Sequence, residues 1–278
     1  MIRIFADSTL DLDIDLRHLY NIEVIPLTVT MKDRQYKDGL EIDTQQLFDY
    51  VKKYGELPVT SAVTTEDFIR AFQGQDEIIY ISISSKLSEC YKNAIEAVKQ
   101  LGAENRVRVI DSLSITTGTG ILVLRAAEMR NFGLTAAEIE ERVLALVPKV
   151  RIAVLIDTLE YLRKGGRAST VTALISNILK IRPILQVNPD GTLGVREKIS
   201  GPRIKAIQAL IDGFKRDADN MDSRWIFITH TGCLQDAYWL RGELHAPGHS
   251  EEIKLITAGA VVASHTGPNG IAIIYLLK

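Results

Sequence analysis

Residues 2–8, "IRIFADS", form an almost continuous apolar run that ends in an aspartate and a serine. Two later stretches repeat this pattern, "EIIYISIS" at 77–84 and "VRVIDS" at 107–112. Such runs are typical of strands that are buried on both faces of a parallel sheet. Apolar residues at helical spacing occupy 88–101 and 115–131. The alternation of strands and helices predicts a three-layer α/β domain, with helices on both faces of the sheet.

The second half of the chain has a different order of elements. A helix is predicted at 170–180, and "NPDG" at 188–191 is typical of a hairpin turn between two strands. This order indicates a smaller α+β domain with a mixed sheet, and we place the boundary near residue 150, giving domains 1–150 and 151–278. The remaining predicted elements are helices at 202–217 and 234–245 and strands at 224–230, 253–264 and 271–277.

Composition excludes several classes of protein. The 278 residues carry a net charge of -2, so no global positive field would attract nucleic acid or anionic lipid. Cys90 and Cys233 lie far apart and outside any CxxC motif, which argues against a disulfide framework or a zinc site. No apolar stretch approaches the roughly 20 residues of a membrane span. We therefore expect a cytoplasmic globular protein without a membrane-inserted segment.

Polar residues around the predicted strand ends are the first candidates for a ligand site, because open parallel sheets bind ligands at the carboxyl ends of their strands. Thr64 or Thr65 is explained as the N-cap of a helix predicted at 65–73. Thr60 and Ser61 precede them in an expected loop, where hydroxyls and amides would suit an anion. Ser88, at the start of the helix predicted over 88–101, is either a cap or an anion ligand.

Two further motifs carry cationic or titratable groups beside glycines. In "LRKGGRAS" (162–169), Arg167 is either part of a solvated charge run or a planar clamp for an anion. In "SHTGPNG" (264–270), His265 is expected at the end of a strand, as a structural residue or a site residue. Together with the hydroxyl groups above, these residues would form a site for a carboxylate or phosphate if the fold brings them together.

Enzymatic interpretations have weaker support. Ser88, His265 and either Asp7 or Asp111 could supply a catalytic set, but no GxSxG elbow is present. Asp7 lacks the second carboxylate that a magnesium site would need, since Thr9 stands two residues later. Dinucleotide and P-loop motifs are absent. We therefore expect no metal and no cofactor, and we favour binding over catalysis.

The motifs resemble the DegV family, bacterial fatty-acid-binding proteins that include the substrate-binding subunits of fatty acid kinase. The resemblance implies a two-domain α/β protein that holds one long-chain fatty acid, such as palmitate, in a tunnel between the domains. A separate ATP-dependent kinase subunit would then phosphorylate the presented carboxylate. The resemblance runs along almost the whole chain and rests on "ADST", "TSAVTTEDF", "SSKLSECYKNA", "DS" at 111–112, "LEYLRKGGRAS", "ILKIRPIL" and "HTGPNG".

The resemblance also implies roles for individual residues. Thr60 and Ser88 match the family's carboxylate ligands, and Ser61 is a neighbour of this site. Arg167 and His265 match the arginine and histidine beside the head group and are expected to supply positive charge. The alternative that remains open is a stand-alone hydrolase or phosphatase that uses Ser88 and His265.

Three residues depart from the family pattern. Glu89 and Cys90 replace the usual glycine and threonine after the ligand serine, and Asn269 replaces a glycine after "HTGP". An added carboxylate at position 89 is expected to weaken or reshape head-group binding. Chain-length preference would depend on apolar residues around 115–125 and 170–185.

Overall fold

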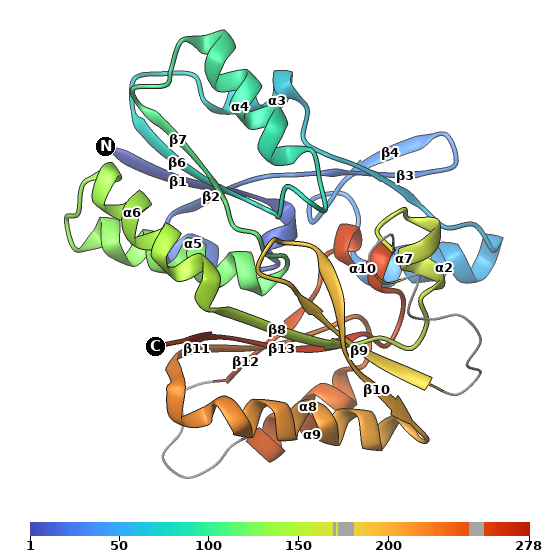
Figure 1. Ribbon diagram of the computed structural model, residues 1–278. Helices are drawn as coiled ribbons and strands as arrows, with labels where there is room; N and C mark the ends of the chain where they lie inside the picture. Colours follow the sequence, from blue (N-terminus) through green and yellow to red (C-terminus); the bar gives the residue numbers. More distant parts are fainter. Residues whose placement is uncertain (169–170, 172–180, 245–252) are drawn as a thin grey trace.

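The computed structural model describes residues 1–168, 171, 181–244 and 253–278. Two principal sheets form the molecule, one from each half of the chain, and α5 (Thr117–Asn131) packs between them (Figure 1). Buried residues surround α5 on all sides, because it contacts β1 of the first sheet as well as β8, β11 and β13 of the second. The two halves of the chain therefore share a hydrophobic core.

The first sheet has four parallel strands in the order β2-β1-β6-β7, which confirms the predicted parallel sheet. Successive side chains point to opposite faces. Phe5 and Tyr80 pack with Phe68 of α3, whereas Ile4 and Ile79 pack on the other face with α5. Helices therefore cover both faces, as predicted. The strands are β1 (Ile2–Asp7), β2 (Ile22–Ile25), β6 (Glu77–Ser82) and β7 (Val107–Asp111).

Helices of the first half begin where the sequence places capping residues. Thr64 accepts a hydrogen bond from the Asp67 amide and is the N-cap of α3, as predicted. Thr135 caps α6 in the same way and forms a capping box with Glu138. Side-chain caps are present at α1 (Ile14–Leu19), α2 (Thr44–Tyr54), α3 (Thr65–Ala71) and α6 (Ala136–Leu146). The N-cap residue of α4 (Cys90–Leu101) makes no such bond, and the short turns are η1 (Ser8–Leu10) and η2 (Val147–Lys149).

A small antiparallel sheet, in the order β4-β3-β5, was not predicted. It consists of β3 (Thr28–Met31), β4 (Arg34–Lys37) and β5 (Val59–Ser61). The expectation that Thr60 and Ser61 lie in a loop is wrong, because β5 pairs with β3 and places Thr60 opposite Val29. This pairing is between distant segments, so the short run around Thr60 gave no local sign of it. The strand fixes the backbone that carries two of the candidate site residues.

The second sheet is mixed and has the strand order β10-β9-β8-β13-β11-β12, with only β11 and β12 parallel among its described pairs. The hairpin predicted around "NPDG" is confirmed, and the Asn188 amide donates to the Thr192 carbonyl across its turn. The helix predicted at 170–180 lies almost wholly outside the described residues. The strands are β8 (Val150–Leu155), β9 (Ile181–Val187), β10 (Leu193–Ser200), β11 (Met221–His230), β12 (Ile253–Thr257) and β13 (Ile271–Leu277).

The outer face of the mixed sheet is covered by α8 (Arg203–Asp217) and α9 (Leu234–Leu244), with η4 (Ala218–Asn220) after α8 (Figure 1). Both helices were predicted. The second sheet begins at Val150, the residue at which we place the end of the first domain. The division of the chain at this residue stays a prediction. Among the described helices, none has the length and apolar character that a membrane span requires.

One prediction in the second half is wrong and affects the site. The strand predicted over 253–264 ends at Thr257, and α10 (Ala260–Thr266) follows. The run of alanine and valine resembles a strand locally, but Gly259 turns the chain and the carboxylates of Asp11 and Asp38 accept backbone N–H bonds at the helix start. His265 therefore lies in the last turn of a helix rather than at a strand end.

Candidate functional site

A cavity lies between the carboxyl-terminal ends of the parallel strands and the inner face of the mixed sheet. The space not filled by protein atoms amounts to about 980 Å³, part of it open to solvent. Both halves of the chain supply its walls, which agrees with the predicted position between the domains. Apolar lining residues include Leu27, Ile83, Ile115, Val154, Leu185 and Val261.

Several threonines also line the cavity, but their hydroxyl groups already have protein partners. Thr9 donates to Asp7, Thr116 donates to Asp11 at 2.6 Å, and Thr229 pairs with Thr117 at 2.9 Å. Because these hydroxyls are satisfied internally, this part of the cavity offers few free polar groups. It therefore suits an apolar ligand.

All five predicted site residues line this same cavity, although they come from four segments of the chain. Thr60 is half-buried on β5, and Ser61 is exposed beside it. The remaining three are also half-buried, so this group of residues lies where the cavity approaches the surface. We call Thr60, Ser61, Ser88, Arg167 and His265 the polar cluster. The structure thus brings together residues that lie far apart in the sequence.

His265 is joined directly to Thr60, with 2.8 Å between Nε2 of the imidazole and Oγ1 of the threonine. Burial and, to a smaller extent, the positive charge of Arg167 lower the pKa of His265 to about 4. The imidazole is therefore neutral at neutral pH, so the expectation that it supplies positive charge is wrong for this structure. Its role as a hydrogen-bonding group toward Thr60 has direct geometric support.

Arg167 is the cation of the polar cluster. Its Nε donates to the Leu87 carbonyl at 3.1 Å and its Nη1 to the Gly165 carbonyl at 2.8 Å. No carboxylate of the described residues lies within ion-pair distance of this guanidinium. Arg167 is thus held in place by neutral carbonyl groups, and its charge is left available for an anion.

The glycines before Arg167 allow close approach to His265. The short helix α7 (Glu160–Lys164) ends at Gly165, and a β-carbon built on Gly165 would lie 2.7 Å from Cε1 of His265. Gly166 follows with φ at +73°, a conformation that favours glycine. The "KGGR" sequence therefore lets the α7 segment pass against the imidazole and then return Arg167 to the same site.

Ser88 lies just before α4, and its Oγ accepts a 3.3 Å bond from the Cys90 amide. The same hydroxyl is 3.2 Å from the Cys90 sulfur, a weak acceptor. Burial and the nearby Asp7 raise the pKa of the Cys90 thiol to about 12, so this cysteine stays a neutral thiol. A carboxylate ligand would be a much stronger acceptor for the Ser88 proton.

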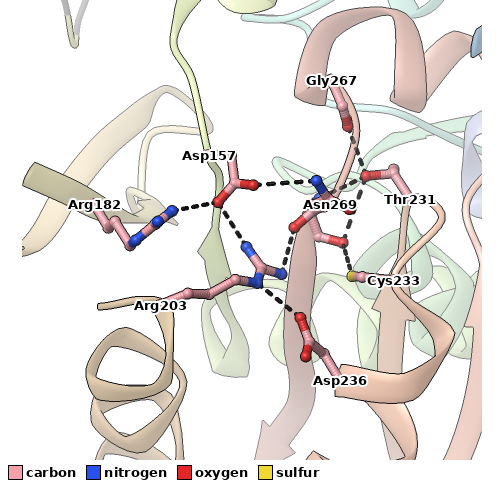
Figure 2. Close-up of polar contacts among 9 residues, drawn as sticks. Asp157, Arg182, Arg203, Thr231, Cys233, Asp236, Gly267 and Asn269 are labelled. Carbon is pink, nitrogen blue, oxygen red and sulfur yellow. Dashed lines mark hydrogen bonds and ion pairs between the residues drawn. The ribbon is translucent and has the colours of Figure 1, made fainter. Parts of the chain in front are cut away.

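All three departures from the family pattern lie outside the cavity lining. Glu89 is exposed and pairs with Lys92 at 3.1 Å. Asn269 donates to Asp157 at 3.2 Å, and its carbonyl accepts from Arg203 at 2.6 Å (Figure 2). These contacts hold the turn that follows His265. Among the described residues Glu89 has no recorded hydrogen bond or ion pair with the polar cluster, and the effect expected of it on head-group binding stays a prediction.

The catalytic set considered for a hydrolase is not assembled in the described part of the chain. His265 pairs with Thr60 rather than with Ser88. Asp7 is fully buried and accepts from Tyr80 at 2.9 Å, while Asp111 accepts from backbone amides of its own region. The described residues also contain no group of histidine, cysteine and acidic side chains suited to a metal ion.

Most apolar lining residues were missed by sequence reasoning. Ile115 and Leu185 fall in the two stretches named for chain-length preference, but none of Ile152 and Val154 of β8 and Val187 of β9 does so. Alternate residues of these strands face the cavity, and a period of two in "RIAVL" would have been the signal. Which face of that strand meets a ligand depends on the packing of the two sheets.

A two-sheet α/β architecture with an apolar interdomain cavity and a polar cluster at its edge defines a class of ligand-binding proteins. Comparison with protein families identifies which one. Residues 1–278 match the family model described as an uncharacterised protein of the DegV family. A DegV domain-containing protein of Caldanaerobacter subterraneus is 34% identical over 99% of this chain and 98% of its own. The chain therefore belongs to the DegV family.

Solved structures agree in fold. A DegV family protein from Thermus thermophilus, described by its fatty acid binding, has a TM-score of 0.91 at 30% identity and covers 99% of each chain. DegV of Bacillus subtilis, described as a fatty acid binding protein, has a TM-score of 0.90 at 27% identity over 100% of this chain and 99% of its own. The B3 protein of Streptococcus pneumoniae fatty acid kinase, loaded with linoleic acid, has a TM-score of 0.86 over 100% of each chain, and at 22% identity it supports the fold alone.

Proposed function

We propose that this protein binds one long-chain fatty acid, such as palmitate, with its acyl chain in the interdomain cavity and its carboxylate at the polar cluster. The observation that carries the proposal is the joining of an apolar cavity to Thr60, Ser88, Arg167 and His265 in a single site. Fatty-acid binding by the Thermus and Bacillus relatives supports the same assignment.

The two parts of the cavity match the two parts of such a ligand. Burial of about 14 methylene groups at about 0.8 kcal/mol each gives an upper bound of roughly 11 kcal/mol, before the costs of association. The carboxylate must keep hydrogen bonds when it leaves water, because an unpaired buried anion costs several kcal/mol. Arg167 supplies charge, and the hydroxyls of Thr60 and Ser88 supply donors. Ser61 lies at the exposed rim beside them.

The proposed role is that of a non-catalytic carrier that works with a separate ATP-dependent kinase. The carboxylate oxygen would attack the γ-phosphorus of ATP held by that partner, giving an acyl phosphate and ADP. The half-buried position of the polar cluster favours such presentation, because the head group would lie near the surface while the chain stays enclosed. In this role the protein would act in lipid metabolism and would need no cofactor of its own.

Native mass spectrometry of the purified protein tests the proposal. We expect an adduct with the mass of a C14 to C18 fatty acid, which denaturation releases intact. Delipidated protein should regain that adduct when palmitate is added. A protein that takes up no fatty acid, or that hydrolyses an acyl ester unaided, would contradict the carrier role and favour the hydrolase alternative.

A further inference from the structure

The first turn of α10 is held by side chains from three segments of the first half of the chain. The Gly259 amide donates to Oδ1 of Asp11 at 2.8 Å, and the Val261 amide donates to Oδ1 of Asp38 at 3.3 Å. The Thr44 hydroxyl donates to the Ala258 carbonyl just before them. Residues more than 200 positions away in sequence therefore fix where this helix begins.

Both carboxylates are buried, with 7% of Asp11 and 3% of Asp38 exposed. Their second oxygens are also occupied, since Asp11 accepts from Thr116 at 2.6 Å and Asp38 accepts from Ser8 at 2.7 Å. No lysine or arginine of the described residues lies within ion-pair distance of either group. Burial raises the pKa of each carboxyl, and that of Asp11 reaches about 8.

Such a pair is costly for helix capping alone. A single serine or threonine satisfies the amides of a helix start, and it does so without burying charge. Two aspartates instead supply acceptors to the first amides of a helix of seven residues, and hydrogen bonds from Thr116 and Ser8 hold the two carboxyl groups in place. A helix this short has little stability of its own, so its position depends on such contacts.

The other end of the same helix carries His265, which contacts Thr60 of β5. Between these ends, α10 packs against α2, α7, β3 and β5 (Figure 1). A shift of the first turn would therefore displace the imidazole from Thr60 and from the Gly165 backbone that lies against it.

We propose that Asp11 and Asp38 are positioning residues for the head-group site: by fixing the first turn of α10, they set the place of His265 beside Thr60. This inference rests on the proposed function for its consequence in affinity. The effect of the two aspartates on the place of the His265 imidazole can be measured without a ligand. Neither aspartate is in the polar cluster, and both act through the helix.

The test compares Asp38→Ala with Asp13→Ala in the full-length protein. Asp13 is the matched control, because it caps α1 through the Leu16 amide at 2.8 Å and has no recorded contact with α10. Two quantities are measured: the affinity for a fluorescent fatty-acid analogue, and the pKa of His265 by NMR titration of its imidazole. Thermal unfolding confirms that each variant is folded.

Asp38→Ala is expected to weaken binding at least about fivefold and to raise the pKa of His265 toward its ordinary value, as the ring loses its enclosed position. Asp13→Ala should change neither quantity. If Asp38→Ala does not fold, Asp11→Ala, which removes the acceptor of the Gly259 amide, decides by the same two measurements. A folded variant with unchanged affinity and unchanged His265 pKa would overturn the positioning role. If the unaltered protein binds no fatty acid, the proposed function fails, while the NMR titration still tests the positioning role.

Discussion

Nε2 of His265 lies 2.8 Å from Oγ1 of Thr60, across 205 positions of sequence. The imidazole is neutral because burial lowers its pKa to about 4. If Nε2 carries the proton, it donates to Thr60, and the threonine hydroxyl is left to donate to an anion in the cavity. This contact therefore gives a neutral histidine a part in binding a carboxylate, by orienting the hydroxyl that would contact it.

Thr60→Val removes that hydroxyl while keeping the shape of the side chain. We expect fatty-acid affinity to fall by about 10- to 100-fold, since a hydrogen bond to a charged group is worth about 1.5–3 kcal/mol. Thr64→Val in the same segment is the control, because Thr64 caps α3 and does not line the cavity. It should lower stability by about 1 kcal/mol and leave affinity unchanged. Equal affinities for the two variants in a displacement titration would contradict the role of Thr60.

Arg167→Ala removes the cation of the polar cluster. Because no carboxylate of the described residues neutralises this guanidinium, a bound fatty acid would lose its counter-charge, and we expect affinity to fall by about 30-fold. Arg167→Lys keeps the charge and loses the planar geometry, so an intermediate loss is expected. Arg163→Ala on the exposed side of α7 is the control. Isothermal titration with palmitate distinguishes these outcomes, and an Arg167→Ala variant as tight as the control would exclude the clamp.

The sequence predicted the parallel sheet, most helices and the whole polar cluster. A continuous apolar run such as residues 77–84 predicts a strand of a parallel sheet that is covered on both faces, because such a strand buries every side chain of the run. The residues of the polar cluster were named from their places beside predicted strand ends, a helix start and glycines, and the family resemblance implied the same residues. Its assembly could not be derived from spacing, since Thr60 meets His265 through the packing of β5 and α10.

What the sequence did not reveal depends on contacts between distant segments. Residues 259–266 have the composition of a strand, yet Asp11 and Asp38 stabilise a helix there. Burial lowers the pKa of His265 and keeps its imidazole neutral, and the local sequence does not reveal this burial. The expected positive charge was wrong for this reason.

Gly165→Ala tests the close approach of α7 to the imidazole. The added methyl group would lie 2.7 Å from Cε1 of His265 and 3.0 Å from the Tyr161 carbonyl, so the ring must move away from its place beside Thr60. We expect a stability loss of about 1–3 kcal/mol and a fall in affinity of about tenfold. Gly242→Ala in α9 is the control, because nothing lies within 4 Å of its added methyl group. It should stabilise the protein by about 0.5–1 kcal/mol. Binding that is equally tight in both variants would show that the ring tolerates displacement.

Val154→Trp tests the assignment of the acyl chain to the cavity. Val154 is a lining residue of β8, and a larger side chain there would occupy space that the distal carbons need. We expect the variant to lose more affinity for palmitate than for decanoate, by about tenfold or more, since each buried methylene contributes about 0.8 kcal/mol. The same substitution at exposed Tyr238 of α9 controls for the added tryptophan. Equal losses for the two chain lengths would place the acyl chain elsewhere.

The pH dependence of stability tests the enclosed state of His265. Its pKa is about 4 in the folded protein against 6.5 for the ordinary side chain, so between these values the unfolded chain binds more protons at this residue. The contribution of His265 to the free energy of unfolding therefore decreases as pH falls from about 6.5 to about 4, and it is constant above that window. Asp11 acts in the opposite direction, because its pKa is raised to about 8 and the folded state holds its proton as pH rises through 4 to 8.

The two contributions are separated by comparison with His265→Gln, which keeps a polar side chain but does not titrate. Asp11 contributes equally to both proteins, so the difference in unfolding free energy between them isolates His265. That difference, measured by urea denaturation, should increase in favour of the unaltered protein from pH 4 to pH 6.5 and stay level above it. Saturating palmitate should raise the pKa of His265, since a nearby carboxylate favours the imidazolium form. Parallel stability curves for the two proteins across this window would show that His265 titrates as an exposed residue and would contradict its enclosed position at the end of α10.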